Sequence, residues 1–93
     1  MYYRDLYHQV LCAVAKLHAE MKNWRKAIEY LTRCLSIDEL QENVHLEIIK
    51  CYLRMGMRKS ALDHYRRMEK TMKQLLNARP SPEAEAVLQL IRR

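Results

Sequence analysis

The chain has 93 residues, a length that folds as one domain with a modest hydrophobic core and leaves no room for an enzyme-sized cavity. It carries 17 Lys and Arg against 11 Asp and Glu, about half of its residues are apolar, and it has only one glycine and two prolines. This composition favours an all-helical protein, and no strand signal is present.

The positive charge is concentrated in the second half of the chain. Residues 1–47 carry six basic and seven acidic side chains, a net charge of −1, whereas residues 48–93 carry eleven and four, a net charge of +7. An acidic partner would therefore bind the second half, unless these side chains only cover solvated helix faces. The candidates for this basic surface are Arg58, Lys59, Arg66, Arg67, Lys70 and Lys73.

The number and spacing of the three cysteines predict neither a disulfide framework nor a zinc site. Cys12, Cys34 and Cys51 are odd in number, far apart in the sequence and without a Cys-x-x-Cys pair. We interpret them as small buried residues in a reducing cytosol, and no motif predicts a metal or another cofactor. The chain also lacks a signal peptide and the roughly 20 apolar residues of a membrane span, so we expect a soluble cytoplasmic protein without membrane contact.

Apolar residues at steps of three and four predict two antiparallel helices in the first part of the chain. The first covers roughly residues 4–22, and the second covers roughly residues 24–37 after a short connection that forces the antiparallel arrangement. The apolar side of the first helix consists of Leu6, Val10, Leu11, Val14, Leu17 and Met21.

A third helix is predicted to begin near Glu39, because Asp38 and Gln41 have the spacing of a capping box. It ends at Met55, where Gly56 can adopt the left-handed conformation that closes a helix.

Two further helices follow, over roughly residues 58–77 and residues 82–92. Ser81 can cap the last of them, and Pro82 suits its first position.

The sequence repeats itself with a period of 34 residues. At this offset Ala27 aligns with Ala61, and the turn at Lys22–Asn23 aligns with the turn at Gly56–Met57. Further identical pairs include Val10 and Val44, Lys16 and Lys50, Met21 and Met55, and Arg33 and Arg67. This is the period of tetratricopeptide repeats, which are helical hairpins that stack.

The two hairpins resemble tetratricopeptide repeats in the small residue of each second helix, Ala27 and Ala61, and in the large residue one turn later, Leu31 and Tyr65. They depart from the pattern at His18, where an aromatic residue is usual, as at Tyr52, and at Glu39, where proline is usual. We predict an all-α, right-handed tetratricopeptide-like stack of two hairpins, about residues 7–39 and 40–77. A capping helix at about residues 82–92 completes a single domain, residues 1–93.

A narrower resemblance covers nearly the whole chain. The matching segments are Asp38-Glu39-Leu40-Gln41-Glu42-Asn43-Val44-His45, Tyr52-Leu53-Arg54-Met55-Gly56, Ala61-Leu62-Asp63-His64-Tyr65 and Pro80-Ser81-Pro82-Glu83. These segments resemble the bacterial transcriptional activator domain of SARP-type regulators. Asn77 stands where that family often has glycine, and Arg4 matches the arginine that often opens this segment.

The resemblance implies a regulatory, oligomerising and protein-interaction module, in which the basic surface meets the transcription machinery. It also implies that the chain is part of a larger regulator, whose separate winged-helix domain binds DNA. Because two repeats are fewer than a stable stack usually has, the first helix should leave an apolar patch partly uncovered. This patch consists of Tyr2, Tyr3, Leu6, Tyr7 and Val10. It favours docking of a further helical hairpin, which the resembling family usually has before this segment, or self-association, unless Leu6 and Val10 pack within the monomer.

Three other functions are compatible with parts of the sequence. A free-standing adaptor would bind an acidic peptide or C-terminus in the concave groove between the first helices of the two hairpins, unless its lysines are merely solvated. The residues expected to face this groove are Gln9, Cys12, Lys16, Glu20, Asn43, Leu46, Lys50 and Arg54, of which Lys16, Asn43, Lys50 and Arg54 are the candidate binding residues.

Direct DNA binding would use the turn at Gly56 and the start of the following helix as a helix-turn-helix, but the apolar face of that helix is committed along its length. Catalysis would need His18 and Cys51 to meet as base and nucleophile, whereas a core cysteine beside a buried histidine is the commoner arrangement. We therefore predict no enzyme and no small-molecule substrate.

Overall fold

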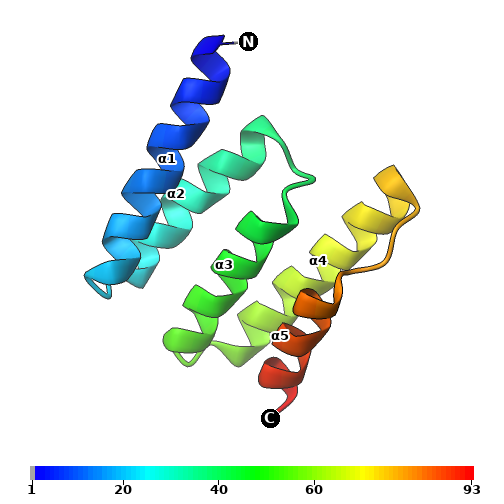
Figure 1. Ribbon diagram of the computed structural model, residues 1–93. Coiled ribbons are helices and arrows are strands. Elements are labelled where there is room, and N and C mark those ends of the chain that lie inside the picture. The colour runs from blue at the N-terminus through cyan, green and yellow to red at the C-terminus, as the bar shows by residue number, and fades with distance from the viewer. Residues whose placement is uncertain (1) are drawn as a thin grey trace.

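The computed structural model describes residues 2–93, and this part of the chain contains five α-helices and no strand. Consecutive helices run antiparallel, and the last helix lies against the third and fourth (Figure 1). The helices are α1 (Tyr2–Glu20), α2 (Trp24–Ile37), α3 (Glu42–Arg54), α4 (Arg58–Leu76) and α5 (Pro82–Arg92). The predicted all-α, tetratricopeptide-like stack of two hairpins and a terminal helix is confirmed. None of these helices combines the length and apolar character that a bilayer crossing requires.

The two hairpins close with the same turn, 34 residues apart. Lys22 and Gly56 both adopt the left-handed conformation, with φ of 60° and 73°. The equivalent backbone hydrogen bonds are Asn23 N to His18 O (2.8 Å) and Met57 N to Tyr52 O (2.9 Å). This bond across a left-handed residue is the Schellman arrangement, which satisfies carbonyls that the end of a helix leaves without a partner. Both predicted turns are therefore present.

Helix α3 separates two hydrophobic clusters. The first cluster, between α3 and the α1–α2 hairpin, consists of Leu11, Ala15, Ala27, Leu31, Cys34, Val44, Ile48 and Cys51. The second, between α3, α4 and α5, consists of Leu46, Ile49, Ala61, Tyr65, Met68, Met72, Ala84, Val87 and Ile91. Tyr52 packs against both clusters. Helix α3 is therefore apolar on two faces, whereas α1 contributes to one cluster only.

The sequence prediction for the first helix was wrong in its bounds and in the face that it buries. Helix α1 runs from Tyr2 to Glu20, and its core residues are Leu11 and Ala15. Other members of the predicted apolar side are exposed: Leu6 (45 %), Val10 (50 %), Leu17 (55 %) and Met21 (60 %). The helix therefore has two apolar faces, a buried one with Leu11 and Ala15 and an exposed one with Leu6, Val10 and Leu17. The sequence prediction treated them as a single face.

The predicted capping box at the third helix was also wrong. Helix α3 begins at Glu42, after Gln41, and ends at Arg54. The Asp38 carboxylate accepts the backbone N–H of Leu40 (3.0 Å) in a local turn, and the Gln41 amide nitrogen donates to the carbonyls of Asp38 (2.7 Å) and Cys34 (3.0 Å). Both side chains therefore hold the α2–α3 connection to the end of α2.

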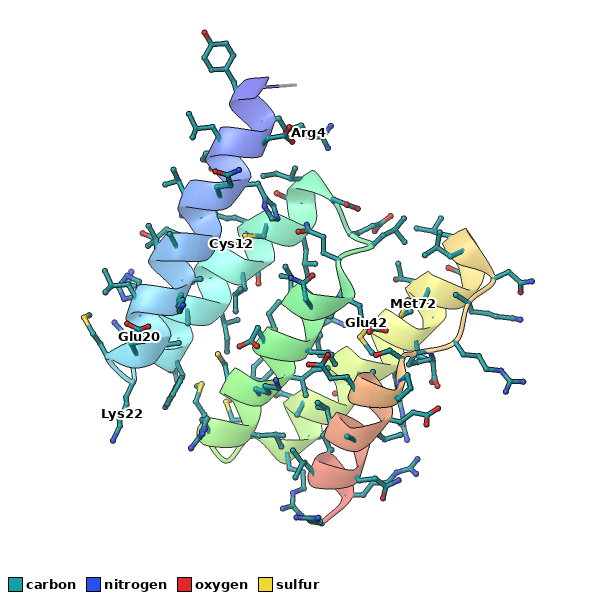
Figure 2. All side chains as sticks on the ribbon, viewed as in Figure 1. Arg4, Cys12, Glu20, Lys22, Glu42 and Met72 are labelled. Carbon is teal, nitrogen blue, oxygen red and sulfur yellow. The ribbon has the colours of Figure 1, made fainter. Side chains whose placement is uncertain are left out.

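Helix α5 begins as predicted. The Ser81 hydroxyl accepts the backbone N–H of Ala84 (3.2 Å), and Pro82 occupies the first position. The Ser81 N–H also donates to the Glu42 carboxylate (3.1 Å), and Figure 2 shows Glu42 pointing from the start of α3 towards the segment before α5. Helix α4 ends at Leu76, and the next residue, Asn77, caps it in the left-handed conformation (φ 50°), which an asparagine tolerates better than most residues.

Candidate functional site

A groove lies between α1 and α3, where the sequence predicts a concave binding surface. It contains a cavity of about 280 Å³ with a mainly apolar lining. The lining residues are Cys12, Ala15, Lys16, Ala19, Leu31, Asn43, Val44, Glu47 and Cys51. Of the four candidate binding residues, Lys16 and Asn43 line this cavity and are exposed to solvent.

Lys50 and Arg54 lie further along α3 and have neighbours of their own. The Lys50 ammonium is 3.6 Å from the Glu47 carboxylate, and the Arg54 guanidinium lies 6.0 Å from the centroid of the Trp24 ring. Because Glu47 lines the cavity together with Lys16, the groove has mixed charge.

The sequence also predicted that Gln9, Cys12, Glu20 and Leu46 face this groove. Cys12 does line it. Leu46 was predicted wrongly: it is 2 % exposed and belongs to the second cluster, because α3 turns this position towards α4 and α5. Gln9 and Glu20 are exposed on α1.

The six residues of the basic surface are all exposed on α4. They are interrupted by the exposed acidic residues Asp63 and Glu69. Lys73 donates to the Asn77 side-chain oxygen (2.7 Å), and Arg67 donates from Nη2 to Nδ1 of His64 (3.2 Å). Arg67 and Lys73 therefore also serve local structure, whereas the other four residues make no side-chain hydrogen bond within the part of the chain that the structure describes. Binding of a partner to this surface stays a prediction.

The structure brings together two histidines that the sequence shows as dispersed. His45 on α3 and His64 on α4 are both buried, and Nδ1 of His45 lies 2.9 Å from Nε2 of His64. Burial of the ring, followed by the charges of His45 and Arg67, lowers the pKa of His64 from 6.5 to about 4. His64 is therefore neutral at physiological pH and serves as a structural hydrogen-bonding group.

A second group that the sequence shows as dispersed consists of His8, Cys12 and Cys34. The Cys12 and Cys34 sulfurs are 3.5 Å apart, and both ring nitrogens of His8 lie 3.8 Å from the Cys12 sulfur. Burial, followed by the contact with Cys12, raises the pKa of Cys34 to about 12. An i, i+4 step on α1 places His8 above Cys12, and this spacing is the one sequence signal that could have suggested the group.

His18 and Cys51, the candidate base and nucleophile, each have other neighbours. His18 stacks on Tyr30, with ring centroids 5.5 Å apart, and lies 3.3 Å from the Asn23 amide. Burial, followed by the charge of Glu47, raises the pKa of Cys51 to about 11, so its thiol stays protonated. A protonated buried thiol is a poor nucleophile.

One face of α1 is apolar and open to solvent. Its residues, which we call the α1 apolar surface, are Leu6, Tyr7, Val10 and Leu17. They follow one another at steps of one, three and seven along the helix, so they lie on one side. The prediction of an uncovered patch is confirmed for Tyr3, Leu6, Tyr7 and Val10, and the side chain of Tyr2 lies outside the described residues.

Comparison with known families gives a match over nearly the whole chain. The family model of the bacterial transcriptional activator domain matches residues 2–92, which is nearly the whole chain and all five helices. No curated protein and no solved structure matches the chain. The matched family is a family of regulatory domains of transcriptional activators and not of enzymes. The chain belongs to the bacterial transcriptional activator domain family.

Proposed function

We propose that this domain is the regulatory, oligomerising and protein-interaction module of a cytoplasmic bacterial transcriptional activator, and that it positions a separate winged-helix DNA-binding domain of the same regulator. The family match over residues 2–92 is the observation that carries this proposal. A helical stack suits the role, because its rigid hairpins fix the distance between whatever is attached to them.

The α1 apolar surface is our candidate for the oligomer interface. Helix α1 packs against α2 through Leu11 and Ala15, while Leu6, Val10 and Leu17 remain exposed on another face. A continuous apolar face of this kind on a soluble domain marks a site of association. Two copies that meet through α1 would cover both surfaces with one symmetric contact, which is the commonest arrangement of homodimers.

Sedimentation equilibrium tests this interface. The wild-type domain should associate in a concentration-dependent way, and Leu6→Glu combined with Val10→Glu should leave it monomeric. Gln9→Glu is the matched control, because it adds a negative charge on an exposed position of α1 outside the apolar surface. A wild-type domain that stays monomeric at high concentration, or a double variant that still associates, contradicts an oligomer built on this surface.

The basic surface on α4 is the candidate contact with the transcription machinery. Arg58, Lys59, Arg66 and Lys70 are exposed on the helix that lies at the opposite end of the stack from α1. Lys59→Glu combined with Lys70→Glu should lower transcription from a reporter driven by the intact regulator while the helical content is unchanged. Lys26→Glu on α2 is the control, because it reverses one exposed charge away from α4. An unchanged reporter signal in the double variant removes this surface from the proposal.

A second candidate function is a peptide-binding adaptor, and the cavity between α1 and α3 favours it. Under this hypothesis the groove holds an acidic peptide or a terminal carboxylate through Lys16, Lys50 and Arg54. Lys50→Glu combined with Arg54→Glu should then abolish peptide capture. The same variant should leave association through the α1 apolar surface intact if the regulator hypothesis holds, so one protein preparation separates the two functions.

A further inference from the structure

A cluster of soft metal ligands joins α1 to α2 near the α2–α3 connection. His8 and Cys12 come from α1, and Cys34 comes from the last turn of α2. One ligand atom from each residue lies within 4.8 Å of the other two. Figure 2 shows Cys12 on the side of α1 that faces α2. We propose that His8, Cys12 and Cys34 form a binding site for a thiophilic cation, with Zn²⁺ as the ion that fits the donor set.

The distances within the cluster are close to those of a metal site. With Zn–S of about 2.3 Å and Zn–N of about 2.1 Å, tetrahedral ligands lie roughly 3.8 Å apart for two sulfurs and roughly 3.6 Å apart for sulfur and nitrogen. The structure has 3.5 Å between the Cys12 and Cys34 sulfurs and 3.8 Å between the Cys12 sulfur and His8 Nδ1. The third pair, the ligand atoms of His8 and Cys34, lies within 4.8 Å, so binding of one ion by all three residues requires side-chain rotations that bring these two atoms closer.

Gln41 fixes the ring of His8 in the state that a metal requires. The Gln41 amide nitrogen donates to two carbonyls, those of Cys34 (3.0 Å) and Asp38 (2.7 Å), so its oxygen must face His8. That oxygen only accepts, and it contacts Nε2 of His8, which therefore carries the proton. The Nδ1 lone pair is left for a metal. Histidine ligands commonly donate their other N–H to a carbonyl in this way, which orients the ring.

The donor set narrows the choice of ion. Two thiolates and one imidazole favour zinc over magnesium or calcium, which prefer oxygen ligands. Three protein ligands leave the fourth tetrahedral position for water or for an additional ligand. Because the ligands come from two helices and Gln41 belongs to the connection, the bound ion would tie α1 to the remainder of the stack. The proposal of this metal site does not rest on the proposed regulatory function.

Binding can be measured on the whole domain, prepared with a reductant and freed of metal. Competition with a chromophoric chelator should give one Zn²⁺ per chain, and Co²⁺ as a probe should show the thiolate charge-transfer band and the visible spectrum of tetrahedral coordination. Zn²⁺ should also raise the melting temperature. His8→Ala, Cys12→Ser and Cys34→Ala should each weaken Zn²⁺ binding by about 100-fold or more, and Gln41→Leu by about 10-fold.

Cys51→Ala is the matched control, because Cys51 is a buried cysteine of the same hydrophobic cluster that lies outside the ligand group. It should bind Zn²⁺ as the wild type does. His8→Ala keeps the test sharp if a cysteine variant fails to fold, since His8 is only partly buried. Zn²⁺ binding that survives His8→Ala unchanged, a Co²⁺ complex without the thiolate band, or a Cys12–Cys34 disulfide in place of metal binding would overturn the proposal.

Discussion

Nδ1 of His45 lies 2.9 Å from Nε2 of His64 between α3 and α4, and the neighbours of the two rings determine where the protons are. The Arg67 guanidinium, which can only donate, contacts Nδ1 of His64 at 3.2 Å. Nε2 of His45 lies 2.8 Å from the carbonyl of Glu39, which can only accept. His64 therefore donates from Nε2 to Nδ1 of His45, and Nε2 of His45 donates to the Glu39 carbonyl. This chain of hydrogen bonds connects α4, α3 and the α2–α3 connection.

We expect the domain to lose stability as the pH falls from about 6.5 to about 4. The pKa of His64 is about 4 in the folded chain, mainly because the ring is buried, and 6.5 is its ordinary value. Between these values the unfolded chain binds a proton that the folded chain does not, so the free energy of unfolding decreases by as much as about 3 kcal/mol. Above about pH 6.5 this contribution is fully present and constant.

Urea unfolding at a series of pH values measures this effect. His64→Gln should reduce the pH dependence between 6.5 and 4, whereas the control His18→Gln should retain it, because His18 is not in the network. Equal slopes for wild type and His64→Gln would show that other groups cause the acid sensitivity.

Substitutions at the two hairpin turns, Lys22→Gly and Gly56→Ala, should change the stability of the domain in opposite directions. A residue other than glycine in the left-handed conformation is strained by roughly 1–2 kcal/mol. Replacing it with glycine removes this strain but also makes the unfolded chain more flexible, so the net gain in stability is smaller than the strain. We expect Lys22→Gly to stabilise the domain by about 0.5–1 kcal/mol and Gly56→Ala to destabilise it by about 1 kcal/mol. A Cβ at Gly56 would meet no atom within 4 Å, so the loss comes from the backbone alone.

Thermal unfolding of the turn variants provides the measurement, with Lys22→Ala as a control that removes the side chain and retains the strain. A lower melting temperature for Lys22→Gly would contradict the assigned backbone conformation.

Ser81→Ala should destabilise the domain by about 1 kcal/mol, because it removes the hydroxyl that accepts the Ala84 N–H at the start of α5. Ser36→Ala should change stability little, since the Ser36 hydroxyl donates to a carbonyl within α2, that of Arg33. Denaturant midpoints of both variants test the difference. A Ser36→Ala variant as unstable as Ser81→Ala would show that the capping bond is not the cause.

The isolated domain should show only weak DNA binding that depends strongly on salt. Lys and Arg side chains on α4 attract phosphates regardless of base sequence, and this attraction weakens steeply as salt rises. A gel-shift titration at low and at physiological salt should show loss of binding at the higher concentration. Lys59→Glu combined with Lys70→Glu should remove the remaining low-salt shift. Sequence-selective binding that persists at physiological salt would assign DNA reading to this domain itself.

Local features of the sequence predicted the fold well. The turns at Lys22 and Gly56, the cap at Ser81 and the left-handed Asn77 depend on a few neighbouring residues, so the sequence contains the signal. The capping box failed because the Gln41 side chain bonds to Cys34, seven residues earlier, and this contact depends on how the connection folds back.

The candidate site was harder to predict because it depends on how helices are rotated against one another. Leu46 aligns with the predicted groove by its spacing, but α3 is buried on two sides and directs Leu46 to the second cluster. Cys12 and Cys34 are 22 residues apart and meet only because α1 and α2 pack with these faces together. Apolar spacing on α1 likewise does not show which of two apolar faces, that of Leu11 or that of Val10, meets the core.

The double burial of α3 has a consequence for how the domain melts. Residues of this one helix complete both hydrophobic clusters, and Tyr52 contacts each of them. In long arrays of repeats a terminal unit can fray while the others persist, because each unit meets only its neighbours. Here unfolding of the α1–α2 hairpin exposes one side of α3, and unfolding of α4 and α5 exposes the other side, so the domain should unfold in a single cooperative transition.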